Sequence, residues 1–524
     1  MKETGASPHP PGAARSGGRT GVAPASVVEA FVRHAREEPE KPCIFFEGDE
    51  WSYGRLLERA ERFAAALGER GIARGERVAL FLGNSPDFLA AYLGTHLAGA
   101  VVVPVNTAYK RAELGHIFED SGARLCLTDA ERRTEIEGLR TDLPDLETVV
   151  EVGEGLEEML GTAGPYELRL PDGEDLATIA YTSGTTGRSK GAMLLHRNLV
   201  ANVAAVCEAW RWGPDDRLLL TLPLFHTHGL TVGAHGTLYV GASAELHRRF
   251  DADRVYDALL GGETTMFFGV PTMYARLLRE ARARDERPGP LRLYVAGSAP
   301  LSPGAFAEFE ELFGERILER YGMTETGMNL TNPYDGERRP GTVGAPFPGQ
   351  EARVVGVKGR DLLGPGEVGE IEVRGPHVFA GYWRRPDATE ESLGADGWFR
   401  TGDLGSVSPD GYYTITGRAK ELIISGGYNV YPREVEEVLE GCPGVAEVAV
   451  VGLPDEEYGE KVAAAVVRDD PGLEATKVID FCRGDLAGFK RPREVVFLDE
   501  LPRNALGKVQ KHLVRDGLLK GEDS

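Results

Sequence analysis

The sequence predicts an α/β protein with a large N-terminal region of layered α/β subdomains, a β-rich subdomain, and a small C-terminal α+β domain. Two patterns lead to this prediction. Apolar residues at helical spacing alternate with short β-branched or apolar runs as far as about residue 340, and short strand-like runs between Gly, Pro and Asp turns then follow. In addition, a chain of 524 residues is too long to fold around one hydrophobic core, so two or three domains are expected.

The N-terminal region begins with two amphipathic segments, at 26–39 and 53–71, whose apolar residues recur at helical spacing. Strands are expected where the apolar runs are short, at 77–83, 100–106, 124–129, 148–152, 176–184, 217–225, 264–271 and 291–300. Helices and strands alternating in this way predict parallel sheets covered by helices.

The pattern changes at Gly341, after which the runs 351–357, 369–375 and 411–417 predict short strands. A mixed helix and strand pattern resumes after Gly417. We therefore expect residues 1–26 to be a disordered extension rich in Gly, Pro and Ala, 27–417 to form the large domain, and 418–524 to form the small one.

The composition narrows the class of function. The formal net charge of -23 argues against a general nucleic-acid surface, but it leaves nucleotides possible as substrates. No apolar run approaches the roughly 20 residues that span a bilayer, so no membrane partner is expected. The five cysteines lack metal-binding spacing and are expected to be free thiols in a reducing compartment, which favours a cytoplasmic protein. The sequence fits a monomer or a small homo-oligomer equally well.

The strongest local motif is YTSGTTGRSKG at 181–191, which follows an expected strand. Its glycines let backbone N–H groups close on an anion, while its hydroxyls and Lys190 add donors and charge. The motif does not have the Walker spacing, because Lys190 stands third after Gly187. It predicts a polyphosphate-binding loop rather than a solvated linker.

This motif resembles the phosphate loop of the acyl-adenylate-forming enzymes, which include acyl-CoA synthetases, adenylation domains and luciferases. The resemblance extends from about residue 28 to 515. The other family motifs occur in family order: LPLFHTHG at 222–229, VAGSAPL at 295–301, RYGMTET at 320–326, GWFRTGDLG at 397–405, GRAKELIISGGYNVYP at 417–432 and PRNALGK at 502–508.

The resemblance implies a nucleotide site for ATP and AMP. Its residues are Thr182, Ser183, Gly184, Thr185, Thr186, Gly187, Lys190, Gly297, Ser298, Ala299, Pro300, Arg320, Tyr321, Gly322, Met323, Asp403 and Arg418. Aromatic Tyr321 can cover a purine face, and the family gives Asp403 and Arg418 the ribose. Taken alone, Asp403 would be read as a turn residue.

The family also implies the catalytic groups Thr324, Glu325, His226 and Lys508. Glu325 would hold Mg²⁺ through its hard oxygens, although alone it could be a carboxylate at a helix N-terminus. Lys508 would neutralise the charge that develops as pyrophosphate leaves, although alone it would be a surface lysine.

In the family, the C-terminal domain is mobile and rotates about the position of Lys420 between the two half-reactions. The rotation would withdraw Lys508 and bring Ser425, Gly426, Gly427 and Tyr428 to the site to bind coenzyme A. Glycine at 426 and 427 would let a narrow pantetheine arm pass close to the backbone. The alternative reading of this segment is a simple turn.

The His226-Thr227-His228 motif has two readings. A His-x-His pair could bind zinc, but no matching Cys or carboxylate stands nearby. The family instead places His226 beside the acyl carboxylate, with His228 as a packed core residue.

The acid is expected to be malonate. Segments 222–230, 291–301 and especially 320–344 resemble the malonyl-CoA synthetases, and the substrate pocket would contain His226, Thr227, Arg292, Ser298 and Met328. Arg292, at the start of an expected strand, is predicted to pair with the distal carboxylate, since a buried charge needs a partner. Gly327 departs from the larger residue of the relatives and is expected to widen the pocket toward methylmalonate.

The sequence therefore predicts an ATP-dependent, AMP-forming acid–CoA ligase that makes malonyl-CoA or methylmalonyl-CoA. Three alternatives stay open: a medium-chain fatty-acid or aryl-acid CoA ligase, an adenylation enzyme loading a carrier protein, and a luciferase-type oxygenase. A non-catalytic nucleotide-binding regulator is a reading from another class, and the presence of Glu325 and Lys508 speaks against it.

Overall fold

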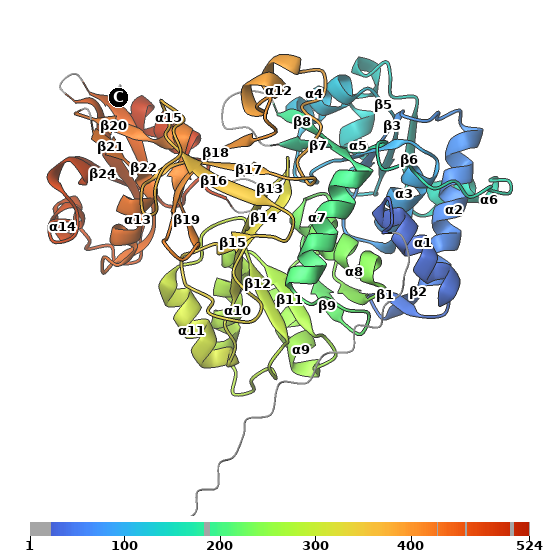
Figure 1. The fold of residues 1–524 in the computed structure, drawn as a ribbon, viewed down its shortest axis with the longest axis horizontal. Helices are drawn as coiled ribbons and strands as arrows, with labels where there is room; N and C mark the ends of the chain where they lie inside the picture. The colour runs from blue at the N-terminus through green and yellow to red at the C-terminus, as the bar shows by residue number, and fades with distance from the viewer. Residues whose placement is uncertain (1–22, 183–188, 427, 456–457, 504–507, 523–524) are drawn as a thin grey trace, which may run out of the picture.

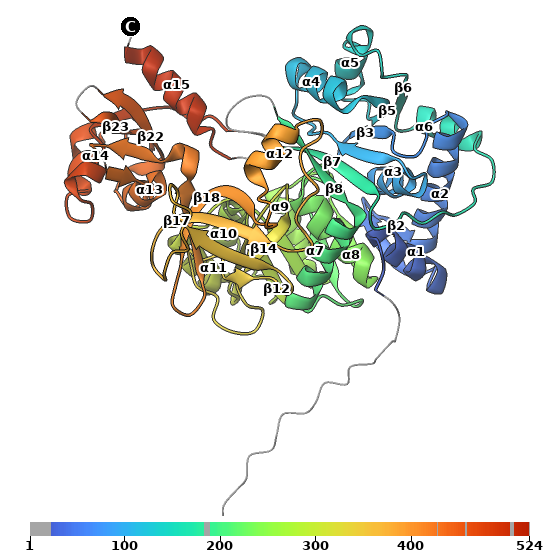
Figure 2. The ribbon, with the colours of Figure 1, turned by 45° about the horizontal axis from the view of Figure 1, so that its top comes forward.

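A computed structural model describes residues 23–182, 189–426, 428–455, 458–503 and 508–522. In this part of the chain the strands form four sheets, and the C-terminal domain lies at one end of the molecule (Figures 1 and 2). The predicted α/β class, with a large N-terminal region and a smaller C-terminal domain, is confirmed. Residues 1–22 of the predicted extension lie outside the described residues.

The first sheet comes from the N-terminal part of the chain and is parallel except at one edge. Its strands, in spatial order, are β6 (Thr148–Glu151), β5 (Ala123–Thr128), β3 (Arg77–Phe81), β4 (Val101–Pro104), β7 (Leu176–Thr182) and β8 (Lys190–Leu195). Only β8 is antiparallel to its neighbour. The predicted phosphate-binding loop is therefore the connection between β7 and β8.

The largest sheet is parallel at its centre and antiparallel at both edges. Its strands, in spatial order, are β15 (Ala345–Pro346), β14 (Gly327–Thr331), β13 (Leu318–Met323), β12 (Leu293–Ala296), β11 (Met266–Gly269), β9 (Arg217–Leu220), β10 (Ser243–Leu246), β1 (Pro42–Phe46) and β2 (Asp49–Ser52). The segments after β9, β12 and β13 carry three of the recognised motifs, so these motifs leave the same edge of one sheet.

Helices cover both sheets. The α-helices are α1 (Val27–Glu37), α2 (Tyr53–Glu69), α3 (Pro86–Leu97), α4 (Arg111–Ser121), α5 (Arg133–Glu137), α6 (Glu154–Gly161), α7 (His196–Ala209), α8 (His235–Val240), α9 (Ala252–Gly261), α10 (Pro271–Ala283), α11 (Pro303–Phe313), α12 (Pro386–Ser392), α13 (Pro432–Glu440), α14 (Ala475–Phe481) and α15 (Lys511–Glu522). Several begin at the caps that the sequence offers: Ser26, Ser52, Ser85 and Asp251 each accept a hydrogen bond from the first turn.

Both faces of the two parallel sheets are buried. In β3, Val78 and Leu80 belong to the core shared with α1, α3, α7 and α8, whereas Ala79 and Phe81 belong to a second core on the opposite face. In β9, Leu218 and Leu220 face the same shared core. Because side chains alternate along a strand, continuous apolar runs suit a sheet with helices on both faces. The helices between the sheets hold the two subdomains in one unit (Figure 1).

Two smaller sheets follow. The β-rich unit is antiparallel, with the order β16 (Glu351–Val355), β17 (Gly369–Arg374), β18 (Phe399–Val407) and β19 (Tyr413–Arg418). The C-terminal sheet has the order β21 (Tyr428–Val430), β20 (Ile423–Ser425), β23 (Gly459–Arg468) and β22 (Val445–Asp455), with β24 (Glu494–Phe497) beside β23. The short helix Ala419–Glu421 connects them and contains Lys420. A division at 417/418 stays a prediction.

Two properties of side chains in the described residues bear on the sequence analysis. None of the helices there has both the length and the apolar composition that crossing a membrane requires. The five cysteines are free and buried. Burial raises the pKa of the thiols of Cys43, Cys126 and Cys207, so none of these is poised as a thiolate.

Buried histidines are a marked feature of the shared core. His96 packs edge-on against His196 at 4.8 Å between ring centroids, and Tyr92 makes a 2.9 Å hydrogen bond to Nε2 of His235. Burial lowers the pKa of His196 to about 4 and of His235 to about 3, and it lowers the pKa of His96 as well. The fold therefore holds these rings neutral.

We expect stability to fall as the pH drops from 6.5 to 4. In this window the histidines of the unfolded chain bind protons, whereas the buried histidines of the folded chain stay neutral. The free energy of unfolding therefore decreases with falling pH, by up to about 1.4 kcal/mol per pH unit for each histidine. Glu319, whose pKa burial raises to about 7, has the opposite effect, as do Glu325 and Glu61, but the histidines with a lowered pKa are more numerous. Urea midpoints measured between pH 4.5 and 8 check this. His96→Leu should flatten the profile, and a flat wild-type profile would contradict the prediction.

Candidate active site

The predicted motifs meet at the edge where parallel strands end. Thr182 ends β7, the segment 221–228 follows β9, Gly297 follows β12, and Thr324 follows β13. Ligands of α/β proteins bind outside the carboxyl ends of such strands. This edge is therefore the candidate active site.

The phosphate loop is anchored at both ends. Thr182 pairs with Lys190 across β7 and β8, and the Thr182 hydroxyl donates to the Lys190 carbonyl oxygen at 3.4 Å. The Lys190 ammonium lies 4.5 Å from the centroid of the Tyr382 ring. The predicted phosphate-binding residues Ser183, Gly184, Thr185, Thr186 and Gly187 lie outside the described residues.

Glu325 is buried in the turn between β13 and β14, with 6% of its surface exposed. The Tyr382 hydroxyl donates to Oε1 of Glu325 at 2.8 Å, and the backbone N–H of Phe379 donates to the Glu325 carbonyl oxygen at 2.9 Å. Burial raises the pKa of Glu325, which the Tyr382 hydrogen bond counteracts. Tyr382 thus links the phosphate loop to Glu325, a connection that its Gly-Tyr-Trp sequence did not reveal.

Asp403 joins the nucleotide motifs of β13, β18 and β19. Its Oδ1 accepts from Nε of Arg418 at 2.9 Å, and its Oδ2 accepts from the Tyr321 hydroxyl at 2.5 Å. Asp403 lies opposite Arg418 in the antiparallel register. The two predicted ribose residues and the predicted adenine residue therefore form one partly buried cluster, next to the start of the C-terminal domain.

The loop that contains His226 is held in place by a residue of the other subdomain. Asn84, which follows β3, accepts from the N–H of Leu224 at 2.8 Å and donates to the carbonyl oxygen of Leu222 at 3.0 Å. Within the loop, Nδ1 of His226 accepts from the N–H of His228 at 3.3 Å. A ring that accepts at Nδ1 carries its proton at Nε2. Burial lowers the pKa of His226 to about 4, so this neutral tautomer is the form at pH 7.

His228 is a core residue, as expected. It is 1% exposed and stacks on Phe268 at 6.3 Å between centroids. Thr227 is also buried, and its carbonyl oxygen accepts from the Thr231 hydroxyl at 2.9 Å.

Arg320 has an unusual environment. It is 3% exposed, and neither its Nε nor its Nη2 has a hydrogen-bond partner among the described residues. Its guanidinium lies against Gly297, where an added Cβ would come within 2.6 Å of the guanidinium carbon. Burial lowers the pKa of Arg320 to about 9, yet the group remains a cation at pH 7. Glycine at 297 is therefore what makes room for this cation, beside Ser298, whose φ of 72° is left-handed.

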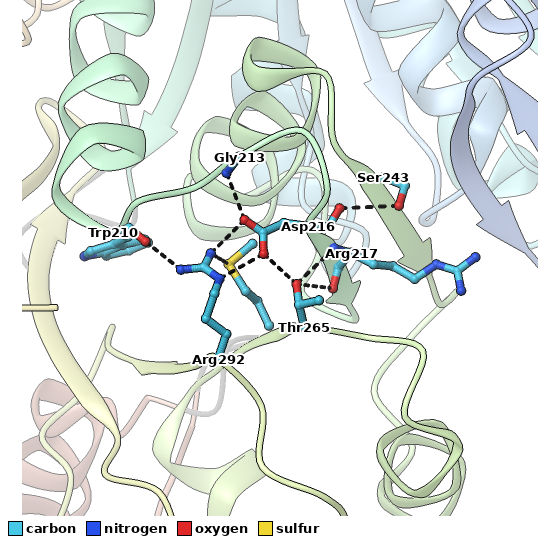
Figure 3. Close-up of polar contacts among 8 residues, drawn as sticks. Trp210, Gly213, Asp216, Arg217, Ser243, Thr265 and Arg292 are labelled. Carbon is cyan, nitrogen blue, oxygen red and sulfur yellow. Dashed lines mark hydrogen bonds and ion pairs between the residues drawn. The ribbon is translucent and has the colours of Figure 1, made fainter. Parts of the chain in front are cut away.

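Arg292 does not lie in the site, so the prediction that it binds the distal carboxylate is wrong. Its Nε and Nη2 pair with the two oxygens of Asp216 at 2.9 and 2.8 Å, and its Nη1 donates to the Trp210 carbonyl oxygen at 2.8 Å (Figure 3). Arg292 precedes β12, whereas Gly297 follows that strand, a separation of roughly 17 Å at 3.3 Å per residue. Arg292 is a structural residue at the opposite edge of the sheet.

Gly327 also departs from its predicted role. Its φ is 65°, and an added Cβ would come within 2.4 Å of Oδ1 of Asn202. Asn202 accepts from the N–H of Met328 at 3.1 Å and donates to the carbonyl oxygen of Met328 at 2.8 Å. Gly327 is required by the turn and by this close approach, so it does not widen an acyl pocket. Met328 itself is buried.

The C-terminal domain presents Lys508 to the site. Although Lys508 is exposed, the dense protein around its ammonium lowers its pKa, and the charge of Arg418 lowers it further. Its charge in turn contributes to the lowered pKa of His226.

The predicted coenzyme A segment lies elsewhere in this arrangement. Ser425 is buried in β20, and Tyr428 is 60% exposed and stacks on Phe489 at 4.5 Å between centroids. β20 and β21 lie on the outer side of the C-terminal domain, away from β13 (Figure 1). Gly426 has a φ of 57°, and Gly427 lies outside the described residues.

Comparisons with known proteins identify the class. The family model "AMP-binding enzyme" matches residues 31–383, and "AMP-binding enzyme C-terminal domain" matches 434–508. The chain therefore belongs to the AMP-binding enzymes, the acyl-adenylate-forming superfamily, and is an acid–thiol ligase.

Among its relatives, sulfoacetate–CoA ligase of Cupriavidus necator is 38% identical over 493 residues, covering 91% of this chain and 95% of the relative. Indoleacetate–CoA ligase of Aromatoleum aromaticum is 38% identical over 498 residues, covering 93% and 97%. The crystal structure of ATP-bound MatB from Rhodopseudomonas palustris is similar with a TM-score of 0.87 and 41% identity, covering 94% of this chain and 98% of that one.

We expect Arg292→Leu to destabilise the fold without changing acid selectivity. Removing the guanidinium strands the buried Asp216 carboxylate, which should cost about 2–4 kcal/mol of unfolding free energy, since Arg292 is a quarter exposed. Urea unfolding measures this, with Arg282→Leu as the control because its pair with Glu308 is more exposed. A selective loss of activity toward diacids would restore the original assignment of Arg292.

Proposed function

We propose that this ligase activates malonate as malonyl-adenylate at the expense of ATP and transfers the malonyl group to coenzyme A. The observation that carries the proposal is Arg320, a buried cation without a hydrogen-bond partner at Nε or Nη2 among the described residues. An unpaired buried charge is costly and is relieved by a bound anion. An acid with a second, non-reacting carboxylate supplies that anion, and a guanidinium binds it with paired donors.

The surrounding residues support a dicarboxylate of short length. Arg320 and His226 are close enough for the cation to lower the pKa of the histidine. His226 Nε2–H can then donate to the reacting carboxylate while Arg320 binds the distal one. Thr227, Ser298 and Met328 would complete the pocket. The likeness of segment 320–344 to malonyl-CoA synthetases favours the same acid.

A second acid fits the same observation. Sulfoacetate also carries an anion one carbon from its carboxylate, and the relative from Cupriavidus necator is named for that acid. Arg320 argues for both acids over the uncharged side chain of indoleacetate or of a fatty acid. Gly327 was expected to widen the pocket for methylmalonate. Because the turn and Asn202 account for this glycine, it gives no support for methylmalonate as the acid.

The remaining residues have roles in adenylation. Asp403, Arg418 and Tyr321 would hold the nucleoside, and the phosphate loop with Lys190 would hold the phosphates. The attacking carboxylate oxygen forms a bond to the α-phosphorus, and pyrophosphate leaves as the bond to the β-phosphate oxygen breaks. Lys508, near Asp403 and Arg418, would neutralise the negative charge that develops on the leaving oxygens.

The site also fits Mg²⁺. Glu325 offers a buried carboxylate oriented by Tyr382, and Thr324 adds a hydroxyl. Mg²⁺ commonly binds through one or two carboxylates and substrate phosphates while keeping several waters, so no all-protein cage is needed. The ion would supply charge neutralisation at the ATP phosphates. Glu325 would orient it.

Thioester formation would use a different domain arrangement. Lys508 and the Ser425–Tyr428 segment belong to one domain but do not face the site together, so a rotation near Lys420 would exchange them. This supports a division into 27–417 and 418–524, with each arrangement serving one half-reaction. A carrier protein in place of coenzyme A is the alternative acceptor.

We expect Arg320→Leu to lower kcat/KM for malonate about 10²–10³-fold or more, the consequence of losing about 3–5 kcal/mol from a buried charge pair. Activity with butyrate should persist or rise. The variant should also be at least as stable as the wild type, because it removes an unpaired buried charge. Steady-state kinetics with malonate, sulfoacetate and butyrate, together with urea unfolding, check this. An equal loss for all acids with lower stability would make Arg320 structural.

Lys508→Ala should reduce malonate-dependent exchange of pyrophosphate into ATP about 10²–10³-fold, by analogy with the loss of one transition-state donor. Supplied malonyl-adenylate should still react with coenzyme A at a normal rate. Lys477→Ala, another exposed lysine of the C-terminal domain, is the matched control. Near-normal exchange in Lys508→Ala would remove Lys508 from the reaction.

A further inference from the structure

Two buried asparagines of α7 bind the backbone on both sides of Glu325. Asn198 and Asn202 are four residues apart, so their side chains leave the same face of this helix. They are 1% and 4% exposed. Neither stands in one of the recognised motifs, yet both contact segments that surround the buried carboxylate.

Asn202 fixes the chain directly after Glu325. Its side-chain amide donates to the carbonyl oxygens of Thr326 at 3.3 Å and Met328 at 2.8 Å, and its oxygen accepts from the N–H of Met328 at 3.1 Å. This approach needs the glycine at 327, since a Cβ there would meet the Asn202 amide. The turn from β13 to β14 therefore takes its position from α7.

Asn198 fixes the segment that bonds Glu325 from the other side. Its side-chain amide donates to two carbonyl oxygens of the segment 376–378, at 2.8 and 2.9 Å. The next residue, Phe379, donates its backbone N–H to the carbonyl oxygen of Glu325, and Tyr382 donates its hydroxyl to the carboxylate. Asn198 thus holds the chain that orients the Glu325 side chain.

The asparagines act through the backbone and not by contact with a substrate. Both N–H groups of each amide are already used by backbone carbonyl oxygens. A cavity of about 10 Å³ lies between them and the turn, and its lining includes Asn198, Asn202, Thr324 and Thr326. This volume is about that of one water probe, so no substrate group fits there.

A carboxylate that binds a metal depends on the groups that orient it. Mg²⁺ requires nearly ideal octahedral geometry, so a small displacement of a ligand weakens its binding. Outer partners of metal ligands therefore affect affinity although they do not touch the ion. Tyr382 is one such partner of Glu325, and the two asparagines hold the backbone on which both residues stand.

We propose that Asn198 and Asn202 are positioning residues that set the place of the Glu325 carboxylate for Mg²⁺ at the ATP phosphates. Asn202 fixes the turn that carries Glu325, and Asn198 fixes the segment that carries Tyr382. Helix α7 thereby acts as the reference to which both parts of the metal site are aligned. This inference rests on the proposed metal role of Glu325 but not on which acid is used.

The test measures binding of the Mn²⁺ complex of α,β-methylene-ATP, a nucleotide that cannot release pyrophosphate. Mn²⁺ takes the same oxygen ligands as Mg²⁺, and its EPR signal reports binding. Asn198→Ala and Asn202→Ala should each raise the Kd of this complex about 10–100-fold, the usual cost of losing an outer partner of a metal ligand. In EDTA, the Kd of the nucleotide alone should stay at the wild-type value, because the asparagines do not contact it.

Asn332→Ala is the matched control. Asn332 is 1% exposed, its side-chain amide donates to the carbonyl oxygens of Glu319 at 3.1 Å and Thr342 at 2.7 Å, and its oxygen accepts from the N–H of Arg339 at 3.1 Å. The control therefore loses the same kinds of hydrogen bond without loosening the Glu325 turn, and its Kd for the Mn²⁺ complex should equal that of the wild type. Urea unfolding confirms that each variant is folded. Asn198 and Asn202 make separate contacts, so either folded variant decides the test.

An equal rise in Kd with and without metal, or an equal rise in Asn332→Ala, would overturn the inference, since the asparagines would then only stabilise the fold. Glu325→Gln separates this inference from the proposed function. If Glu325→Gln leaves the Kd of the Mn²⁺ complex unchanged, the metal role of Glu325 fails and the inference fails with it. If Glu325→Gln raises that Kd and the asparagine variants do not, only the inference fails.

Discussion

Two parallel sheets point the carboxyl ends of their strands toward a common region, and every part of the site depends on this alignment. It requires both faces of each sheet to be buried, because the crossover helices must cover them. The helices α1, α3, α7 and α8 provide a core that both sheets share. The rigid scaffold then fixes loops that have few constraints of their own. Asn84 illustrates this, since it belongs to one subdomain and holds the histidine loop of the other.

The buried titratable groups of this scaffold differ in their charge and in whether they have hydrogen-bond partners. The buried histidines are neutral because desolvation disfavours their cations, and burial likewise lowers the pKa of His226. Arg320 stays charged although burial lowers its pKa. Among the described residues its Nε and Nη2 have no partner, whereas Arg292 has its full complement in Asp216 and Trp210. A buried cation with donors that lack a partner in the free protein is suited to bind an anionic ligand. A cation whose donors are already paired instead stabilises the fold.

The candidate nucleotide cluster also depends on contacts between segments that are far apart in the sequence. In the cluster of Tyr321, Asp403 and Arg418, polar groups from β13, β18 and β19 meet.

The sequence by itself determined the α/β class, the order of the elements and the chemistry of the motifs, because these depend on local periodicity and on short segments such as 181–191 and 320–326. It did not determine which arginine meets the acid. Arg292 and Arg320 both stand beside recognised motifs, and only folding brings Asp216 to the first and leaves the second without a partner at Nε and Nη2 among the described residues. Gly327 is a similar case, since its neighbour Asn202 lies far away in the sequence. Pairing and close approach are set by the tertiary structure, where residues distant in the chain become neighbours.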